Sequence, residues 1–260
     1  MSGSGNVQMI KASGLSIEVE RRGAGRPLFL LASEEQLERE AAFVNELAKT
    51  FEVIMPSPPG FGTSERPDWL SNPDDLSYIM LDVIDVLGLK DVTVLGFSLG
   101  GWIAAEMAVK NTNKISKLVL VDAYGVKIGG PLDRDILDIW TDHPSKVAAA
   151  KWANPENGKR DFSVMNDDQL TVVARNTESF ARFCWSPYMH NPNLRQRLHR
   201  VNVPTLFIWG EKDGITAPNY GEAYSKLVPG AKFVKIANAG HYPHLEAREA
   251  FMSALNGFIN

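Results

Sequence analysis

Residues Val94-Leu-Gly-Phe-Ser-Leu-Gly-Gly-Trp102 place one serine between two glycines, after an apolar run and before a helical pattern. Core packing does not explain this serine, because its side chain is short and polar while its neighbours are apolar. Gly96-Phe-Ser-Leu-Gly100 matches the G-x-S-x-G pattern of a tight strand-to-helix turn that carries a nucleophile. The pattern predicts that Ser98 Oγ is exposed above the carboxyl ends of the strands, and that the N–H of Leu99 faces an oxyanion.

The chain on both sides of this turn alternates between apolar runs and helical patterns. Five continuous apolar runs are typical of strands buried on both faces, at residues 27–31, 51–55, 92–96, 117–121 and 205–209. Apolar residues at helical spacing fill the segments between them, at residues 37–48 and 76–87, with Asn72-Pro73 as N-cap and first residue of the second helix. Two alternating stretches, 7–11 and 15–21, predict an N-terminal antiparallel hairpin with Gly14 at its turn. The pattern predicts an α/β fold with a mostly parallel, doubly wound sheet.

The alternation stops near Tyr124 and resumes near Pro204. Between them the helical stretches 133–140 and 167–183 are separated by prolines, and no buried strand is recognisable. We therefore predict a helical cap subdomain, residues 124–203, inserted into a core domain of residues 7–123 and 204–260. The aromatic side chains of the cap form its own core or line an apolar pocket; they are Trp140, Trp152, Phe180, Phe183, Trp185 and Tyr188.

A serine nucleophile needs a base that is oriented by an acid. Asp213 follows the strand pattern that ends at Gly210, and His241 follows the next strand pattern. The chain order Ser, Asp, His is that of α/β-hydrolases, and it predicts a triad of Ser98, Asp213 and His241. Asp122, at the end of another predicted strand, is the alternative acid.

From about Leu28 to Phe258 the sequence resembles the α/β-hydrolase superfamily. Within that superfamily it is most similar to the group of esterases and meta-cleavage-product hydrolases. The resemblance rests on the serine turn, on Pro58-Pro-Gly-Phe-Gly-Thr-Ser64 as the glycine-rich loop, and on Gly240-His-Tyr-Pro-His-Leu-Glu246 as the histidine loop. It implies the α/β-hydrolase fold with an inserted helical cap. Tyr242 stands where carbon–carbon hydrolases of this group often carry tryptophan.

The oxyanion loop departs from the family. The resemblance implies His-Gly after the first parallel strand, but this chain has Ala32-Ser-Glu-Glu35. A second oxyanion donor is expected from this loop, through the N–H of Ser33 or Glu34, with the Ser33 hydroxyl as an extra donor. A carboxylate aimed at a developing negative charge would oppose it, so we predict that the Glu34 side chain points away from Ser98.

Composition narrows the class of protein. The chain has 260 residues, 44% of them hydrophobic, and a net charge of −4, which gives no electrostatic footprint for nucleic acid or a membrane surface. The one cysteine, Cys184, excludes internal disulfides and cysteine metal clusters, and is expected to be a buried filler. No metal or cofactor is expected. The start of the chain has no secretory signal pattern and no segment is long enough to span a membrane, so a cytoplasmic protein is expected.

Three functions remain open. The first is a serine hydrolase that cleaves a small or medium carboxylic ester, thioester or lactone through an acyl-enzyme, with the apolar acyl or ring part of the substrate under the cap. The second is a carbon–carbon bond hydrolase of the meta-cleavage-product type. The third is a non-enzymatic ligand-binding protein that keeps the fold. The sequence also leaves open whether the chain forms a homo-oligomer.

Overall fold

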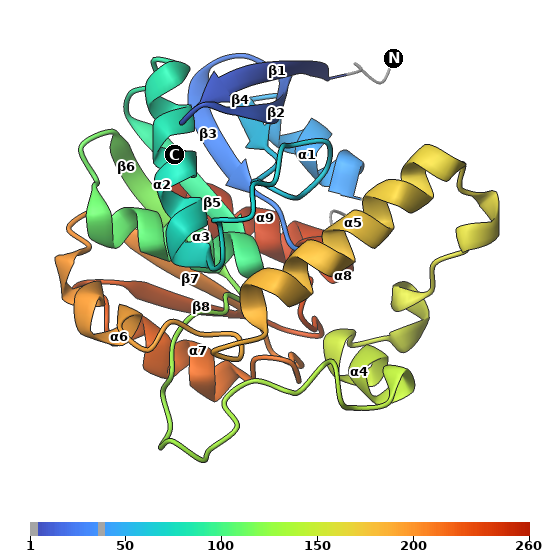
Figure 1. The fold of residues 1–260 in the computed structure, drawn as a ribbon. Coiled ribbons are helices and arrows are strands. Elements are labelled where there is room, and N and C mark those ends of the chain that lie inside the picture. Colours follow the sequence, from blue (N-terminus) through green and yellow to red (C-terminus); the bar gives the residue numbers. More distant parts are fainter. Residues whose placement is uncertain (1–4, 36–39) are drawn as a thin grey trace.

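The fold is built on one eight-stranded sheet (Figure 1). The structure, a computed structural model, describes residues 5–35 and 40–260. The strand order in the sheet is β1-β2-β4-β3-β5-β6-β7-β8. The strands are β1 (Asn6–Ala12), β2 (Leu15–Arg22), β3 (Arg26–Leu31), β4 (Phe51–Pro56), β5 (Val92–Phe97), β6 (Ile115–Val121), β7 (Thr205–Gly210) and β8 (Lys232–Ile236).

Helices connect the parallel strands. The α-helices are α1 (Ala41–Leu47), α2 (Pro73–Val86), α3 (Leu99–Lys110), α4 (Pro144–Lys151), α5 (Asp167–Cys184), α6 (Leu194–Arg197), α7 (Pro218–Ser225), α8 (Pro243–Glu246) and α9 (Arg248–Ile259). Short 3-10 turns are η2 (Pro155–Gly158), η3 (Phe162–Val164) and η4 (Leu198–Arg200). The predicted start of the second helix is confirmed, since Asn72 accepts a hydrogen bond from the N–H of Asp75 at 3.0 Å. The predicted helix at 37–48 is described from residue 40 onward, and its start at Leu37 lies outside the described residues.

The sheet confirms the predicted fold class. β1 pairs with β2, and β2 with β4, in antiparallel register, whereas every pair from β4 across to β8 is parallel. Gly14 forms the hairpin turn with a φ of +78°, a value that costs glycine little. The antiparallel strands therefore lie at one edge, and the carboxyl ends of the parallel strands share one rim of the sheet.

Two separate apolar cores cover the two faces of the sheet. Successive residues of a strand point to opposite faces, so Val94 of β5 lies in one core and Leu95 in the other. The core on the first face is completed by α2, α3 and α7, and the core on the second by α1 and α9. This burial on both faces explains why the parallel strands are continuous apolar runs.

The segment between β6 and β7 contains α4, α5 and α6, and α5 crosses over the sheet rim in Figure 1. The helix α5 confirms the predicted stretch 167–183 and begins with a capping box of Asn166 and Gln169. The predicted helix at 133–140 is wrong, because this stretch is irregular chain with bends and a turn. Asp135 accepts the N–H groups of Ile128 and Gly129, and such side-chain bonds compete with a helix.

Cys184 is fully buried, as expected. Within residues 5–35 and 40–260, no helix combines the length and apolar character needed to cross a bilayer. Two further expectations stay predictions: the division into a core and a cap subdomain, and the cytoplasmic location. Whether the chain forms a homo-oligomer stays open.

Candidate active site

Ser98 occupies a strained turn between β5 and α3. Its backbone has φ of +53° and ψ of −115°, a conformation that non-glycine residues rarely adopt. The N–H of Ser98 donates to the carbonyl of Val121 on β6 at 2.9 Å, which fixes the turn against the neighbouring strand. The strain is held by the surrounding fold, as is typical of functional positions.

The glycines around Ser98 are required by close backbone contacts. A Cβ on Gly96 would lie 2.5 Å from the carbonyl oxygen of Gly100, and a Cβ on Gly100 would lie 2.2 Å from that of Leu31. Both distances are far below any real Cβ contact. The turn thus needs the two glycines of the G-x-S-x-G pattern for steric reasons.

Ser98, His241 and Asp213 form a continuous chain of contacts. Ser98 Oγ lies 2.9 Å from His241 Nε2, and His241 Nδ1 lies 2.8 Å from Asp213 Oδ2. Asp213 is itself held, because its carboxylate accepts the N–H groups of Ile215 and Thr216 and the Thr216 hydroxyl. This is the geometry of a nucleophile, a base and an orienting acid.

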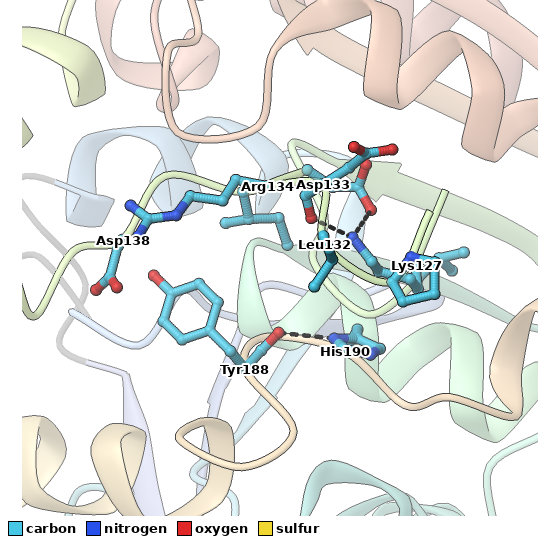
Figure 2. A pocket seen from close by; sticks show the side chains of 11 residues that line it. Lys127, Leu132, Asp133, Arg134, Asp138, Tyr188 and His190 are labelled. Carbon is cyan, nitrogen blue, oxygen red and sulfur yellow. Dashed lines mark hydrogen bonds and ion pairs between the residues drawn. The ribbon is translucent and has the colours of Figure 1, made fainter. Parts of the chain in front are cut away.

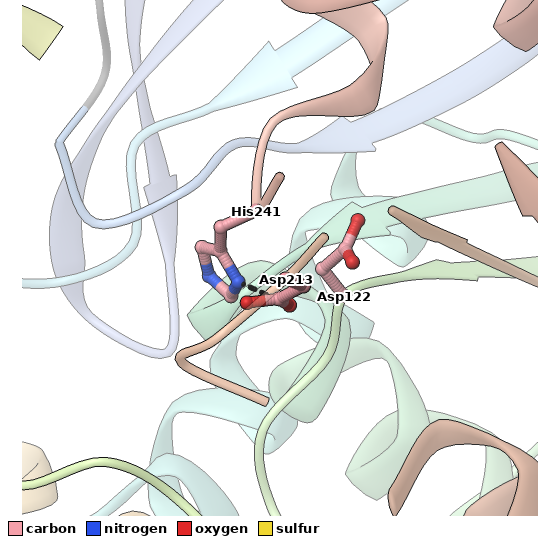
Figure 3. Close-up of side chains that lie close together, drawn as sticks. All are labelled: Asp122, Asp213 and His241. Atoms are coloured by element: carbon pink, nitrogen blue, oxygen red, sulfur yellow. Dashed lines mark hydrogen bonds and ion pairs between the residues drawn. The ribbon is translucent and has the colours of Figure 1, made fainter. Parts of the chain in front are cut away.

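Asp122 lies beyond Asp213, away from the histidine ring (Figure 3). It offers an oxygen within 4.8 Å of a ligand atom of both Asp213 and His241. Asp122 Oδ1 accepts the N–H of Gly210 at 2.9 Å, and burial, followed by the charge of Asp213, raises the pKa of Asp122 well above its usual range. The structure thus brings Asp213, and not the alternative acid, against His241. The three residues are close enough to share a metal ion, but Asp213 and His241 already bond each other.

The Glu34 side chain points toward Ser98, so the prediction that it points away is wrong. Glu34 Oε2 lies 2.8 Å from Ser98 Oγ, and Glu34 Oε1 lies 3.4 Å from the Tyr124 hydroxyl. Lys151 Nζ lies 4.0 Å from the same Oε1 atom. These polar partners, all inside the site, draw the carboxyl inward. Ser98, which Glu34 contacts, is only 1% exposed, so the prediction of an exposed hydroxyl is wrong.

Lys151 is the positive charge closest to this carboxyl, and it is shared with Glu35. It contacts Glu35 Oε1 directly. Burial opposes both charges, yet the attraction between them prevails, so that the pKa of Glu35 is lowered and that of Lys151 is raised. Tyr124, stacked on the ring of His241, is neutral because burial and then Glu34 raise the pKa of its hydroxyl well above the usual range.

The predicted oxyanion donors are placed as follows. Leu99 is the first residue of α3, where backbone N–H groups have no partner within the helix. Ser33 is buried, and its hydroxyl lies 3.4 Å from Glu40 Oε1. The structure therefore brings the Glu34 side chain to Ser98, while the Ser33 hydroxyl is directed to Glu40.

The segment at the end of α4 ties down the two loops that carry Asp213 and His241. The N–H of His241 donates to the carbonyl of Lys151 at 2.8 Å, and the N–H of Gly214 donates to the carbonyl of Ala150 at 2.9 Å. Glu246 adds side-chain bonds, since its carboxylate accepts the N–H groups of Gly240, Ala153 and Asn154. The position of the histidine thus depends on the segment between β6 and β7.

A cavity of about 360 Å³ adjoins Glu34. Glu34, Glu35 and Lys151 give it a charged side, while the remaining lining, from the loop before α4, α4, the segment around η3 and α5, is mostly apolar. The wall residues are Ile139, Trp140, Val147, Arg160, Phe162, Val173, Asn176, Thr177 and Phe180. Glu34 lines this cavity and also contacts Ser98, whereas Ser98 and His241 are not among the lining residues.

A second cavity of about 360 Å³ lies between Lys127, Asp133, Tyr188 and His190 (Figure 2). The carbonyl of Tyr188 contacts His190 Nδ1 at 2.8 Å, and Lys127 bonds the carbonyl of Asp133. Its lining contains no residue of the Ser98, His241 and Asp213 chain.

Sequence reasoning missed the inward Glu34 carboxyl and the partners that surround it, Tyr124 and Lys151. A usable signal existed for Glu34. Two adjacent glutamates directly after a buried strand lie at the same sheet rim as Ser98, where an ionisable side chain is rarely accidental. Nothing in the sequence indicated Lys151, because its contact depends on how the chain beyond β6 folds back.

Comparison with known proteins finds a matching family and several relatives. The sequence model of the alpha/beta hydrolase family matches residues 25–254. A 2-hydroxymuconate semialdehyde hydrolase of Pseudomonas sp. (strain CF600) is 26% identical over 267 residues, covering 96% of this chain and 92% of that protein. Lipase 3 of Moraxella sp. (strain TA144) is 25% identical over 244 residues, covering 86% of this chain and 74% of that protein.

Solved structures agree in fold. A thermophilic esterase from Thermogutta terrifontis superposes with a TM-score of 0.73 at 22% identity, covering 98% of both chains. At that identity the likeness concerns the fold alone.

Proposed function

Because the chain belongs to the alpha/beta hydrolase family and is an enzyme, we propose that it is a serine hydrolase acting on a small or medium carboxylic ester, thioester or lactone. The observation that carries the proposal is the contact of Ser98 Oγ with His241 Nε2 at 2.9 Å, with Asp213 bonded to the other ring nitrogen. The cavity beside Glu34 has room for the apolar acyl part of the substrate.

In the proposed reaction, Ser98 Oγ attacks the carbonyl carbon while His241 Nε2 takes the hydroxyl proton. Asp213 holds the Nδ1–H of His241, so that Nε2 faces the serine and the resulting imidazolium is stabilised. When the tetrahedral intermediate collapses, His241 gives the proton to the leaving oxygen or sulfur. Water then repeats the steps on the acyl-enzyme, and Ser98 is released.

The proposal is tested with Ser98→Ala and a series of p-nitrophenyl esters. We expect kcat to fall by about 10⁴-fold or more, because the covalent route is lost. Ser163→Ala, an exposed serine of η3, is the control and should keep full activity. A fluorophosphonate probe should label Ser98 in the folded enzyme. Full activity of Ser98→Ala, or no labelling of Ser98, would contradict the covalent mechanism.

A second candidate is hydrolysis of a carbon–carbon bond, which the likeness to a 2-hydroxymuconate semialdehyde hydrolase favours. Attack on a ketone also creates an oxyanion, so the same residues would serve. Tyr242 argues against it, since the resemblance implies tryptophan there. Comparing kcat/KM for a ring-cleavage dienoate with that for the esters separates the two.

A further inference from the structure

The Glu34 side chain contacts the nucleophile and also lines the cavity that is proposed to hold the acyl group. Resting on that proposed function, we propose that Glu34 is a gate. Its carboxyl covers Ser98 in the closed state that the structure describes, and it turns toward Lys151 before a substrate reaches the serine. The gate sets the fraction of the enzyme that is ready to bind, and it takes no part in making or breaking bonds.

Ser98 Oγ is enclosed by two contacts. Glu34 Oε2 lies 2.8 Å from this oxygen, and His241 Nε2 lies 2.9 Å from it. Ser98 and His241 are each only 1% exposed, and Glu34 is 4% exposed. A carbonyl carbon that is attacked has to come within about 3–3.5 Å of the serine oxygen. His241 has to stay in contact as the base, so Glu34 is the group that gives way.

The cavity ends at the same side chain. Glu34 lines this cavity of about 360 Å³, whereas Ser98 and His241 are not among the described residues that line it. An acyl chain in the apolar part of the cavity would therefore be separated from the nucleophile by the Glu34 carboxyl. Displacing that carboxyl is the change that joins the cavity to Ser98.

Lys151 offers the displaced carboxyl a partner. Lys151 Nζ lies 4.0 Å from Glu34 Oε1 and lines the same cavity. Burial acts to lower the pKa of Lys151, but the carboxylates of Glu35 and Glu34 outweigh it and the pKa is raised, so the ammonium is charged. A glutamate side chain turns about several single bonds, and such a turn keeps the buried carboxylate beside a cation.

Tyr124 helps to hold the gate closed. Its hydroxyl lies 3.4 Å from Glu34 Oε1, and its ring is stacked on His241. Burial and then the charge of Glu34 raise the pKa of this hydroxyl well above its usual range, so the hydroxyl keeps its hydrogen. Glu34 thus has one set of partners in the closed state, Ser98 and Tyr124, and another in the open state, Lys151. Two such states of one side chain form an equilibrium that a substitution can shift.

The gate depends on the space that the carboxyl fills. It is therefore the same whichever way protons are shared among Ser98, His241 and Glu34, and its test is the access of a reagent to Ser98.

The first measurement is the second-order rate constant for labelling of Ser98 by a fluorophosphonate. Glu34→Ala removes the carboxyl and keeps the backbone N–H of residue 34. We expect labelling about tenfold faster than in the wild type or more, which corresponds to an open state of about a tenth of the enzyme or less. Glu34→Gln keeps a side chain of the same size over Ser98 and cannot form the ion pair with Lys151, so its labelling should be no faster than that of the wild type.

Ester kinetics distinguish a gate from a catalytic residue and from a simple change in cavity size. Because opening precedes binding, Glu34→Ala should lower KM for p-nitrophenyl esters and leave kcat near the wild-type value. The gain in kcat/KM should be equal for acetate and for a long acyl chain, whereas a larger cavity would help only the long chain. Glu249→Ala, at an exposed glutamate of α9, is the control and should leave both constants unchanged.

Tyr124→Phe tests the gate without removing a charge. Phenylalanine keeps a ring beside His241 and loses the hydroxyl that faces Glu34 Oε1. Labelling of Ser98 should be faster than in the wild type and slower than in Glu34→Ala.

Labelling at the wild-type rate in both Glu34→Ala and Tyr124→Phe would overturn the gate. A large fall in kcat of Glu34→Ala would also overturn it, because the carboxyl would then take part in the reaction, and so would a gain confined to long acyl chains. Failure of the proposed function has a different result, since Ser98 would then stay unlabelled in every variant, Glu34→Ala included.

Discussion

Asp122 and Asp213, two buried carboxyl groups at the ends of neighbouring strands, lie side by side behind His241. Only Asp213 bonds the imidazole, at 2.8 Å. Burial and the neighbouring charge raise the pKa of Asp122, so that Asp122 is neutral beside a charged Asp213. The pair thus divides into a carboxylate that bonds the histidine and a neutral neighbour that bonds Gly210.

This division predicts that the same substitution lowers activity strongly at Asp213 and little at Asp122. Asp213→Asn should lower kcat by about 10⁴-fold, because an amide favours the wrong tautomer of His241. Asp122→Asn should keep kcat within about tenfold, since asparagine is neutral and keeps an oxygen for the N–H of Gly210. Kinetics of both variants on one ester check this, and a larger loss in Asp122→Asn than in Asp213→Asn would reverse the assignment.

Asp122 also predicts how stability depends on pH. In the unfolded chain an aspartate ionises above a pH of about 3.9, whereas folded Asp122 keeps its proton to a higher pH. The unfolded state therefore releases this proton first, and the free energy of unfolding falls as pH rises through that window. Asp122→Asn should remove this fall, so its stability relative to wild type should increase from pH 4 to pH 7. Urea unfolding of both proteins across that range measures it; parallel curves would contradict it.

Gly100→Ala should destabilise the fold. The added Cβ would meet the carbonyl oxygen of Leu31 at 2.2 Å, and neither backbone can move freely inside the sheet rim. We expect a loss of more than about 2 kcal/mol in the free energy of unfolding, in line with overpacking of a tight site. Gly257→Ala is the control within another helix, α9, since its Cβ meets nothing within 4 Å. It should stabilise by about 0.5–1 kcal/mol.

The cavity beside Glu34 predicts acyl selectivity. Thr177→Trp would place a large ring in the lining of this cavity. The kcat/KM for a long-chain p-nitrophenyl ester should fall by about tenfold or more while that for acetate stays near wild type, because only the long chain needs the space. Val164→Trp, at a position 77% exposed, is the control. Equal losses for both chain lengths would argue against this cavity as the acyl site.

Glu246 predicts a link between the histidine loop and the chain after α4. Glu246→Ala leaves the N–H groups of Gly240, Ala153 and Asn154 without their acceptor. We expect a loss of about 1–3 kcal/mol in stability and a lower kcat, because the His241 loop loses a support. Glu249→Ala, an exposed glutamate in the first turn of α9, is the control. An unchanged kcat and melting temperature in Glu246→Ala would refute the link.

The local sequence was sufficient to predict the structure wherever one short stretch of residues determines it. The serine turn follows from the glycines at 96 and 100, and the parallel strands follow from their unbroken apolar runs. Asp213 and His241 were found because each comes soon after a strand that ends at the same rim. Their catalytic roles stay predictions.

The failures concern contacts between distant parts of the chain. The direction of Glu34 depends on Tyr124 and Lys151, which reach it from the loop after β6 and from α4. The irregular chain at 133–140 arises because Asp135 bonds backbone N–H groups several residues earlier, which apolar spacing does not reveal. Both outcomes are decided by polar contacts, which hydrophobic periodicity does not encode.

The two carbonyl groups at the end of α4, on Ala150 and Lys151, bond the loops of Asp213 and His241 through the main chain. Main-chain bonds do not depend on side-chain identity, so these two bonds constrain the backbone path here, while the Lys151 side chain is constrained separately by its ion pair with Glu35. A chimera that imports α5 of a relative should therefore keep residues 150–157 from the recipient. A recombination boundary placed after residue 157 would exchange α5 while leaving the histidine anchored.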